Sequence, residues 1–574
     1  MAPGSAKNAE LMIKPVAPRN MAKKKKLAPE TRPPAGKPPE KGAPVRLKQY
    51  EALIFITGAV TLSLEVLASR IMTPYFGVSL YIWAGILSIT LIFLALGYQL
   101  GGKFSKHRGK VELQLSMLAA PLWAALSIVV ATAVYPVVFP FLATINLIVA
   151  SFLGGIILLA LPLVVLSAMN PLLIALARDL NPEGDAGAGR VFFISTVGSV
   201  AGVVLTAFLI IPHLTNFRAL LWLSLGLGLV VAGISLLQGI PESKKRRLLC
   251  GCAAIIFLSG ALLAGQRAFF KMLAGMSDIG KNFEVLAEYT SVFGNIKILE
   301  VHPEGEGRKP GRAYLQDGII QNMVTADGVI MDHTGFMMRL VEAYAPRAQN
   351  SLVLGVAAGM IPRALHRQGG KVIAVEINPN SLAAATEFFD FDPKGVEVHV
   401  EDARTFVRRR QAPAYDLVIT DLFHGDCTPD YLLTVEFFRE VKACLLPGGV
   451  VIINTYFDPN NEAANETILA TVGAVFPYLL ELRSPSSAGL VSSACMVAAN
   501  VPLSPEAAIK LADKEPMPPK DYQTLKAARL VTPAMLKNPR VVSDDHNIFS
   551  ILFASSQLRY RSQFNKLPPN LLVN

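Results

Sequence analysis

The sequence predicts two unlike halves: an N-terminal α-helical membrane bundle of about seven spans, and a C-terminal α/β domain with a small β cap. Three observations lead to this prediction. Long apolar runs follow one another up to about residue 265, soluble composition begins near residue 278, and a strand–turn–helix–strand pattern occupies residues 351–378. With 574 residues and 52% hydrophobic content, the chain is too long and too apolar for one soluble domain.

Residues 1–48 are expected to form a disordered basic tail. They contain 12 Lys and Arg against 3 Glu, which gives +9 of the chain's net charge of +11. A segment so rich in Lys and Pro cannot bury enough apolar surface to fold. Because it has no aromatic residue to stack on bases, we do not expect a nucleic acid as partner. Contact with anionic lipid is the favoured interpretation.

Residues 49–270 are expected to form a multi-pass transmembrane domain in the lipid bilayer. Most of the apolar runs are long enough to cross about 30 Å of hydrocarbon. The expected spans are 52–72, 80–101, 113–135, 150–177, 190–211, 217–237 and 248–265. Segment 136–149 could be a further partial or re-entrant piece, and no cleavable signal peptide is visible because the first long apolar run begins near residue 52.

Loop charges predict the orientation of these spans. Four cations, Lys103, Lys106, Arg108 and Lys110, follow the second span, and residues 244–247 form a second basic loop after the sixth. We expect the protein in the inner or plasma membrane of the cell. The positive-inside rule then places the N-terminus and both basic loops in the cytoplasm. Seven crossings would then leave the C-terminal domain outside. An even count, with 136–149 crossing or 248–265 failing to cross, would place it in the cytoplasm.

Two charged residues, Glu65 and Arg70, fall within the first span, where an unpaired charge is costly. They indicate either a transport or substrate pathway, or else an interhelical ion pair or an arginine at the interface. Small residues in segment 198–202 favour close helix packing. The five cysteines have no metal-ligand spacing, so we expect reduced thiols and no bound metal.

The segment from Ser351 to Asn378 carries the clearest functional pattern. A first apolar run ends at Gly355, a small-residue turn leads to Gly359 and a helix, and a second apolar run closes on Glu376. This order is typical of a nucleotide-binding βαβ unit in a Rossmann-like fold. Small residues let the backbone approach a ligand, and Glu376 can accept hydrogen bonds from both ribose hydroxyls. The glycine pattern is incomplete, so an ordinary packing turn is the alternative.

The strands that follow also end on carboxylates. A cap of short β runs at residues 278–345 precedes the main domain, residues 346–574. In that domain, a strand at 396–400 is followed by Asp402, and a strand at 416–420 by Asp421. Ligands bind at the carboxyl ends of such strands. We expect Asp402 near an adenine amino group and Asp421 beside the group that is transferred, where it could accept a proton.

The soluble half resembles the spermidine synthase family of polyamine aminopropyltransferases, which has a class I methyltransferase-like fold. The resemblance is carried by residues 294–296, 315–321, 401–404 and 543–547, by the unit around Gly355 and Glu376, and by Asp421. Residues 421–437 and 189–199 are similar to a branch of that family fused to a membrane domain. The resemblance covers roughly residues 50–555.

This resemblance implies transfer of an aminopropyl group from decarboxylated S-adenosylmethionine to putrescine or another amine, with methylthioadenosine as product. The donor would be a co-substrate, no cofactor would stay bound, and a homodimer is a further expectation. Asp421 would be the proton acceptor. The nucleoside and the donor's side chain would contact Gly355, Gly359, Glu376, Asp402, Ala403, Asp317 and Gln321. The acceptor would lie near Asp426, His424 and Pro429.

The sequence departs from the family on the acceptor side. His424 stands where soluble synthases have a second Asp, and the stretch from Asp332 to Met338 lacks the family's Tyr and two carboxylates; Phe336 is one of the residues present instead. A desolvated dication needs paired anions, so these losses should weaken putrescine binding.

Three hypotheses follow. The first is a membrane-anchored aminopropyltransferase of polyamine biosynthesis. The second is an S-adenosylmethionine-dependent methyltransferase with a membrane-delivered acceptor, and the third is a non-enzymatic membrane component that retains a synthase-like domain. Because decarboxylated S-adenosylmethionine is cytoplasmic, the first hypothesis needs a cytoplasmic C-terminal domain, and this is the location that we expect.

Overall fold

A computed structural model describes residues 46–180, 187–303, 309–325, 333–484, 489–514, 516–564 and 566–574. Nearly all of the basic tail expected at residues 1–48 lies outside the described residues.

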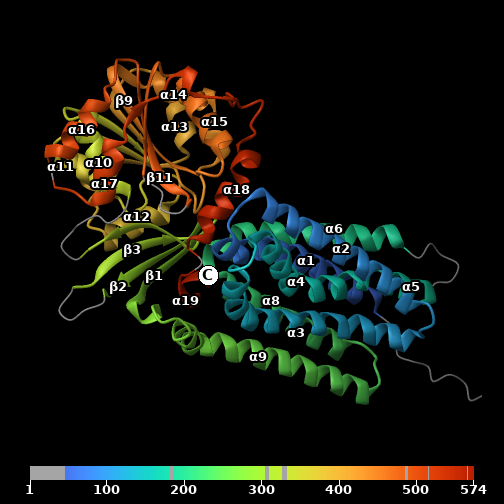
Figure 1. Cartoon of the computed structure of the whole chain (residues 1–574). Helices are drawn as coiled ribbons and strands as arrows, with labels where there is room; N and C mark the ends of the chain where they lie inside the picture. The colour runs from blue at the N-terminus through green and yellow to red at the C-terminus, as the bar shows by residue number, and fades with distance from the viewer. Residues whose placement is uncertain are drawn as a thin grey trace, which may run out of the picture. The chain divides into compact units, whose positions relative to one another are not determined.

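Seven helical segments of the N-terminal half are long and apolar enough to cross a membrane (Figure 1). They confirm the predicted number of spans. Two segments are composite, because α4 continues into α5, and α6 continues through a π turn at Thr206–Ile210 into α7. The helices are α1 (Leu47–Phe76), α2 (Leu80–Ser105), α3 (Lys110–Leu142), α4 (Leu147–Ser167), α5 (Met169–Leu180), α6 (Ala188–Leu205), α7 (Ile211–His213), α8 (Asn216–Leu237) and α9 (Glu242–Ala274).

The even count considered above is not found among the described residues. Segment 136–149 is not a separate re-entrant piece: α3 continues through Pro136 and Pro140 to Leu142, and the side chain of Asn146 then caps α4. Proline is tolerated inside such helices where neighbouring groups satisfy the freed carbonyls. Helix α9 is likewise continuous over 33 residues. If all seven segments cross, a cytoplasmic N-terminus and a cytoplasmic C-terminal domain cannot both hold.

Helices α1 and α6 approach each other closely through glycine, as the small residues of segment 198–202 predicted. A Cβ added to Gly198 would lie 2.1 Å from the carbonyl oxygen of Phe55, and one added to Gly202 would lie 2.2 Å from that of Ala59. Only glycine allows two helix backbones to approach this closely.

Four antiparallel strands in the order β1-β2-β3-β4 form the predicted cap. The four strands form two hairpins, with turns at residues 292–293 and 317–318. The second turn places both Asp317 (φ 46°) and Gly318 (φ 80°) in the left-handed region. The strands are β1 (Phe283–Ser291), β2 (Gly294–Val301), β3 (Gly311–Gln316) and β4 (Ile319–Val324).

An eight-stranded sheet of order β12-β10-β11-β9-β8-β5-β6-β7 forms the centre of the C-terminal domain (Figure 1). The five strands from β9 to β7 in this order are parallel, and β10, β11 and β12 extend the sheet with antiparallel pairs. The strands are β5 (Asn350–Leu354), β6 (Lys371–Glu376), β7 (Glu397–Val400), β8 (Tyr415–Thr420), β9 (Leu445–Phe457), β10 (Tyr478–Arg483), β11 (Ser492–Ala499) and β12 (Arg529–Leu530). The Rossmann-like α/β class is therefore confirmed.

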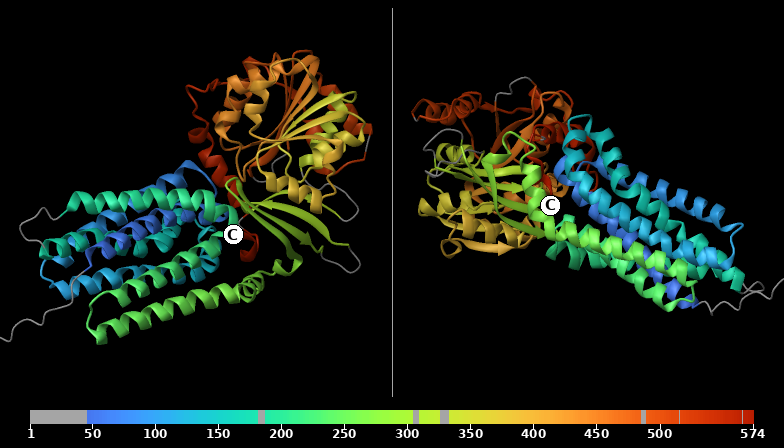
Figure 2. Two further views of the ribbon diagram at one scale, coloured as in Figure 1. Left: turned by 180° about the vertical axis from the view of Figure 1, so that it is seen from behind. Right: turned by 90° about the horizontal axis from the view of Figure 1, so that it is seen from below.

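Helices cover both faces of this sheet (Figure 2). One apolar core contains side chains from α13, α14, α15 and α18, and the other contains side chains from α10, α11, α16 and α17. The helices are α10 (His333–Tyr344), α11 (Met360–Arg367), α12 (Pro379–Phe388), α13 (Ala403–Arg409), α14 (Val435–Ala443), α15 (Glu462–Gly473), α16 (Pro505–Lys514), α17 (Pro519–Lys526), α18 (Phe549–Ser562) and α19 (Pro569–Leu572). Such two-sided covering explains why the central strands are apolar throughout.

Hydrogen bonds connect the first helix to the cap. Arg70 of α1 donates to the carbonyl oxygens of Ser291 (2.5 Å) and Val292 (3.2 Å) at the end of β1. The arginine considered above for a transport pathway or an ion pair therefore binds backbone carbonyl groups of the cap.

Candidate active site

The site is built at the point where the parallel sheet reverses its strand order. Strand β5 pairs with β6 on one side and with β8 on the other, so the loops after β5 and β8 leave in opposite directions. Ligands of doubly wound sheets bind in the crevice at such a switch point. Residues Gly355 and Asp421, which the sequence singled out, directly follow these two strands.

Gly355 is required by the close contact between these two loops. The Asp421 amide donates to the carbonyl of Leu354 (2.8 Å), and a Cβ on Gly355 would lie 2.0 Å from the Asp421 carbonyl oxygen. Gly355 also has a φ of 93°, which L-residues rarely adopt. The backbone therefore needs glycine here for close packing.

A cavity of about 270 Å³ opens at this switch point. Its lining includes seven residues predicted from the sequence: Gly355, Glu376, Asp402, Ala403, Asp421, His424 and Pro429. Four others, Gly359, Asp317, Gln321 and Asp426, are not part of the lining. Gly359 has a packing role, because it caps α11 with a φ of 74° and a Cβ there would lie 2.7 Å from the ring of Phe391.

Glu376 lies at the end of β6 with its carboxylate facing the first loop. One oxygen accepts hydrogen bonds from the amides of Val356 (3.0 Å) and Ala357 (3.2 Å), and the other accepts from the Asn378 amide (2.9 Å). Burial raises the pKa of Glu376, and these backbone hydrogen bonds act in the opposite direction. The carboxylate is thus fixed at the mouth of the βαβ loop, on the wall of the cavity.

Asp402 follows β7 and caps helix α13. Its Oδ1 accepts from the Thr405 amide (2.8 Å), a typical N-cap contact, and its Oδ2 accepts from the hydroxyl of Tyr431 (2.6 Å). Asp402, Ala403 and Tyr431 form one wall of the cavity. Tyr431 was not predicted, because no sequence pattern links it to Asp402.

Asp421 is held by two side chains from other elements. His333 Nε2 lies 3.2 Å from its Oδ2, and Asn454 Nδ2 donates to its Oδ1 at 2.7 Å. Burial alone would raise the pKa of Asp421, but the charge and hydrogen bond of His333 and the hydrogen bond of Asn454 lower it below its usual value. Asp421 is therefore held as a carboxylate.

Asp317 and His424 form a second pair beside the cavity. The His424 Nε2 lies 3.7 Å from the Asp317 Oδ2, and the carboxylate raises the pKa of the imidazole. Asp317 is 6% exposed; burial acts to raise its pKa, but His424 and Arg70 lower it overall. Gln321 lies close by and donates to the Gly425 carbonyl (2.7 Å), so it fixes the loop after β8.

Asp426 is paired with an arginine that the sequence gave no reason to select. The Nε of Arg561 in α18 lies 3.1 Å from the Asp426 Oδ2, and both side chains are 1% exposed. The Nη1 of Arg561 also donates to the carbonyls of Asp317 (2.8 Å) and Pro74 (3.3 Å). Asp426 is thus a buried structural anion, and its predicted contact with an acceptor stays a prediction.

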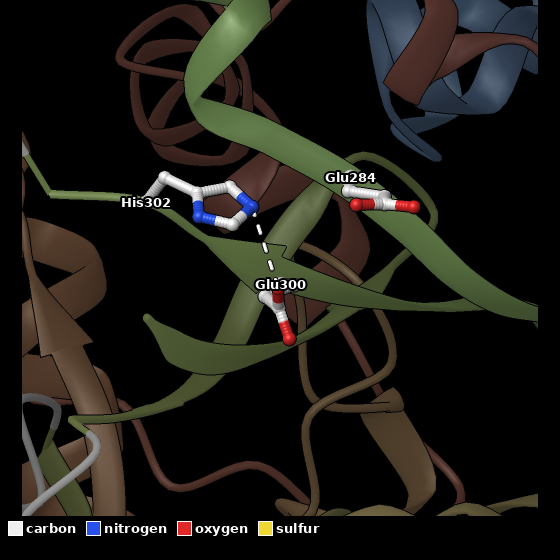
Figure 3. Close-up of side chains that lie close together, drawn as sticks. All are labelled: Glu284, Glu300 and His302. Carbon is white, nitrogen blue, oxygen red and sulfur yellow. Dashed lines mark ion pairs between the residues drawn. The ribbon is translucent and has the colours of Figure 1, made fainter. Parts of the chain in front are cut away.

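A separate cluster in the cap could hold a divalent cation. Glu284 on β1 faces Glu300 on β2, and His302 Nε2 lies 3.4 Å from Glu300 Oε1 (Figure 3). One potential ligand atom from each residue lies within 4.8 Å of the other two. All three residues are at least partly exposed and none lines the cavity, so this cluster adds nothing to the site at the switch point.

The C-terminal half is an α/β domain with a cavity at the switch point of its sheet. Residues 334–482 match the spermine/spermidine synthase domain. The C-terminal half of the chain therefore contains a spermidine synthase-like domain, and the N-terminal half contributes the seven apolar helices.

Similar proteins divide between two transfer reactions. A polyamine aminopropyltransferase of Vibrio vulnificus is 30% identical over 151 residues, which cover 25% of this chain and 50% of that protein. An N-terminal histidine N-methyltransferase of Emericella nidulans is 36% identical over 149 residues, 24% of this chain and 26% of that protein. The chain thus spans half or less of these relatives. The spermidine synthase structure from Thermotoga maritima has 19% identity and a TM-score of 0.34, over 44% of this chain and 86% of that one.

Proposed function

We propose that this protein is a membrane-anchored aminopropyltransferase that moves the aminopropyl group of decarboxylated S-adenosylmethionine to an amine. The observation that carries the proposal is the position of Asp421, a carboxylate held ionised at the switch point of a spermidine synthase-like domain, on the wall of the cavity. A carboxylate there can orient an amine and accept its proton.

The reaction needs only positioning and one proton transfer. The amine nitrogen attacks the aminopropyl carbon that is bonded to the sulfonium sulfur, so a C–N bond forms while the C–S bond breaks. The electron pair of that bond stays on sulfur, which leaves as the neutral thioether of methylthioadenosine, and the amine proton passes to Asp421. Glu376, Asp402 and Ala403 are proposed to hold the nucleoside, since all three line the same cavity.

Methyl transfer from S-adenosylmethionine is a second candidate. It is favoured by the similarity to a histidine N-methyltransferase, which exceeds that to the aminopropyltransferase in identity. The same carboxylate could accept a proton from a nucleophile that attacks a methyl group. The products separate the two reactions, because aminopropyl transfer releases methylthioadenosine and methyl transfer releases S-adenosylhomocysteine.

Full-length protein in detergent can be incubated with each donor and a panel of amines, and both nucleoside products can be quantified. We expect methylthioadenosine from decarboxylated S-adenosylmethionine, with at least a hundredfold loss of rate in Asp421→Asn. Asp278→Asn is a matched control, because Asp278 is an exposed carboxylate in the turn before the cap. Failure to release either nucleoside, together with no nucleoside binding in calorimetry, would leave the non-enzymatic alternative.

A further inference from the structure

Among the described residues, three carboxylates at or beside the cavity already have side-chain partners within the protein. Asp421 is bound by His333, Asp317 lies against His424, and Asp426 is paired with Arg561. These pairs join residues that are distant in sequence, so no local sequence pattern predicts them.

The pairing matters most for a substrate with two positive charges. A diamine such as putrescine carries an ammonium group at each end, and each buried ammonium needs an anion to replace its hydration. The amine that reacts can use Asp421, where its own proton is lost. Among the described carboxylates named above, Asp317 could bind the second ammonium only by losing His424, and Asp426 only by losing Arg561 from a fully buried ion pair. Each displacement leaves a cation without its partner.

Part of the wall of the cavity is apolar, although His424 and Gln316 also line it. Phe293 of the cap hairpin and Leu422 and Phe423 of the loop after β8 line the cavity together with Asp421. Apolar side chains contribute binding energy to an apolar ligand and oppose the burial of a charge. An acceptor could place its one amino group beside Asp421 and its hydrocarbon body against these apolar side chains.

We propose that the acceptor is a monoamine with an apolar body, and that the ion pairs Asp317–His424 and Asp426–Arg561 exclude diamines from this site. The inference rests on the proposed aminopropyl transfer and names its acceptor class. In the reaction, the amine loses one proton to Asp421 as its nitrogen forms the new C–N bond, and the product keeps its apolar end unchanged.

Butylamine and putrescine provide a matched test, because they differ by one terminal amino group on the same four-carbon chain. With decarboxylated S-adenosylmethionine as donor, methylthioadenosine release should give a kcat/KM for butylamine at least tenfold above that for putrescine. Phenylethylamine should also react, since its ring can pack against Phe293 and Phe423. A kcat/KM for putrescine equal to or above that of butylamine would overturn the inference.

Calorimetry with methylthioadenosine separates this inference from the proposed function. If the nucleoside does not bind, the proposed donor site itself fails. If the nucleoside binds but neither monoamine yields product, the acceptor class is wrong while the donor site stands.

A substitution of His424 tests whether its pairing with Asp317 excludes the second ammonium group of a diamine. His424→Asp removes the cation that neutralises Asp317 and adds a carboxylate to the cavity wall, so the preference should shift towards putrescine by at least tenfold. His424→Asn is the control that removes the imidazole without adding an anion, and it should shift the preference less. Unchanged methylthioadenosine binding shows that each variant is folded, and an unaltered preference in a folded His424→Asp protein would contradict the role given to this pair.

Discussion

The guanidinium of Arg561 and the carboxylate of Asp426 form an ion pair in which both side chains are 1% exposed. The arginine comes from α18, near the end of the chain, and the carboxylate comes from the loop after β8. The same guanidinium binds the backbone of the cap at Asp317 and that of α1 at Pro74. One buried cation therefore connects three parts of the fold behind the cavity.

Removal of either partner should destabilise the protein strongly. Arg561→Ala leaves the Asp426 carboxylate buried without a cation, which typically costs about 3–5 kcal/mol of unfolding free energy. Denaturant unfolding of the full-length protein in detergent measures this loss. Arg367→Ala, at an exposed arginine of α11, is the control and should change stability by no more than about 0.5 kcal/mol. Equal effects of the two substitutions would show that the buried pair contributes little.

Gly355→Ala should disrupt the switch point more than its backbone conformation alone explains. Gly355 and Gly369 both have a φ near 90° (93° and 89°), but a Cβ on Gly369 meets nothing within 4 Å, whereas one on Gly355 meets the Asp421 carbonyl. Gly369→Ala should therefore cost only the left-handed strain, about 1–2 kcal/mol. Gly355→Ala should cost about 1–3 kcal/mol more from overpacking, together with loss of methylthioadenosine binding. Thermal unfolding and calorimetry compare the two variants, and similar results for both would argue against the close contact.

An ordinary aspartate has a pKa of about 3.9. Asp421 should stay ionised at pH values below that. Burial opposes this shift, and His333 and Asn454 produce it. Asn454→Ala removes one hydrogen bond to the charged form, so the pKa should rise and the acidic limb of the kcat/KM profile should move to higher pH. A pH–rate profile of each protein measures this limb. An unchanged limb in the variant would mean that Asp421 does not control it.

The pair of Asp317 and His424 should make stability depend on pH in both directions. The folded-state pKa of His424 is raised, so its contribution is complete below about pH 6.5 and is lost as the pH rises through the folded value. The folded-state pKa of Asp317 is lowered, so its contribution is present above about pH 3.9 and is lost as the pH falls through the folded value. Unfolding curves between pH 5 and 9 should show a decline on the alkaline side that His424→Asn abolishes. A decline of the same size in that variant would assign it to other groups.

The seven helices predict that the basic loop between α2 and α3 and the C-terminal domain lie on opposite faces of the membrane. Five of the candidate spans separate them in the chain. Reporters placed in the loop near Lys106 and after Asn574 should therefore give opposite signals. The aminopropyl proposal needs the second reporter in the cytoplasm, where its donor is made. A cytoplasmic loop with an external C-terminus, as the positive-inside rule predicts, would remove that donor and favour the non-enzymatic alternative.

Features encoded locally were predicted well from the sequence. Apolar runs fix the seven helices because burial of apolar side chains in hydrocarbon depends mainly on the length and composition of one segment. Strand-end residues such as Gly355, Glu376 and Asp421 line one cavity, because parallel strands bring their carboxyl ends to the same edge of a sheet. Their roles in binding stay predictions. The span boundaries were less accurate, since loops of a few residues carry little signal: α3 extends to Leu142, well past the expected end at residue 135.

What the sequence by itself determined, then, is the division of the chain into apolar helices and an α/β domain, and the carboxylates at its strand ends. Only the tertiary structure decided which cations those carboxylates meet. His333 lies 88 residues from Asp421 along the chain, and Arg561 lies 135 residues from Asp426. Ion pairs depend on distance in space and on burial, and neither is encoded in a local pattern. In the folded protein, the carboxylates Asp421, Asp317 and Asp426 are bound by side chains of the protein itself.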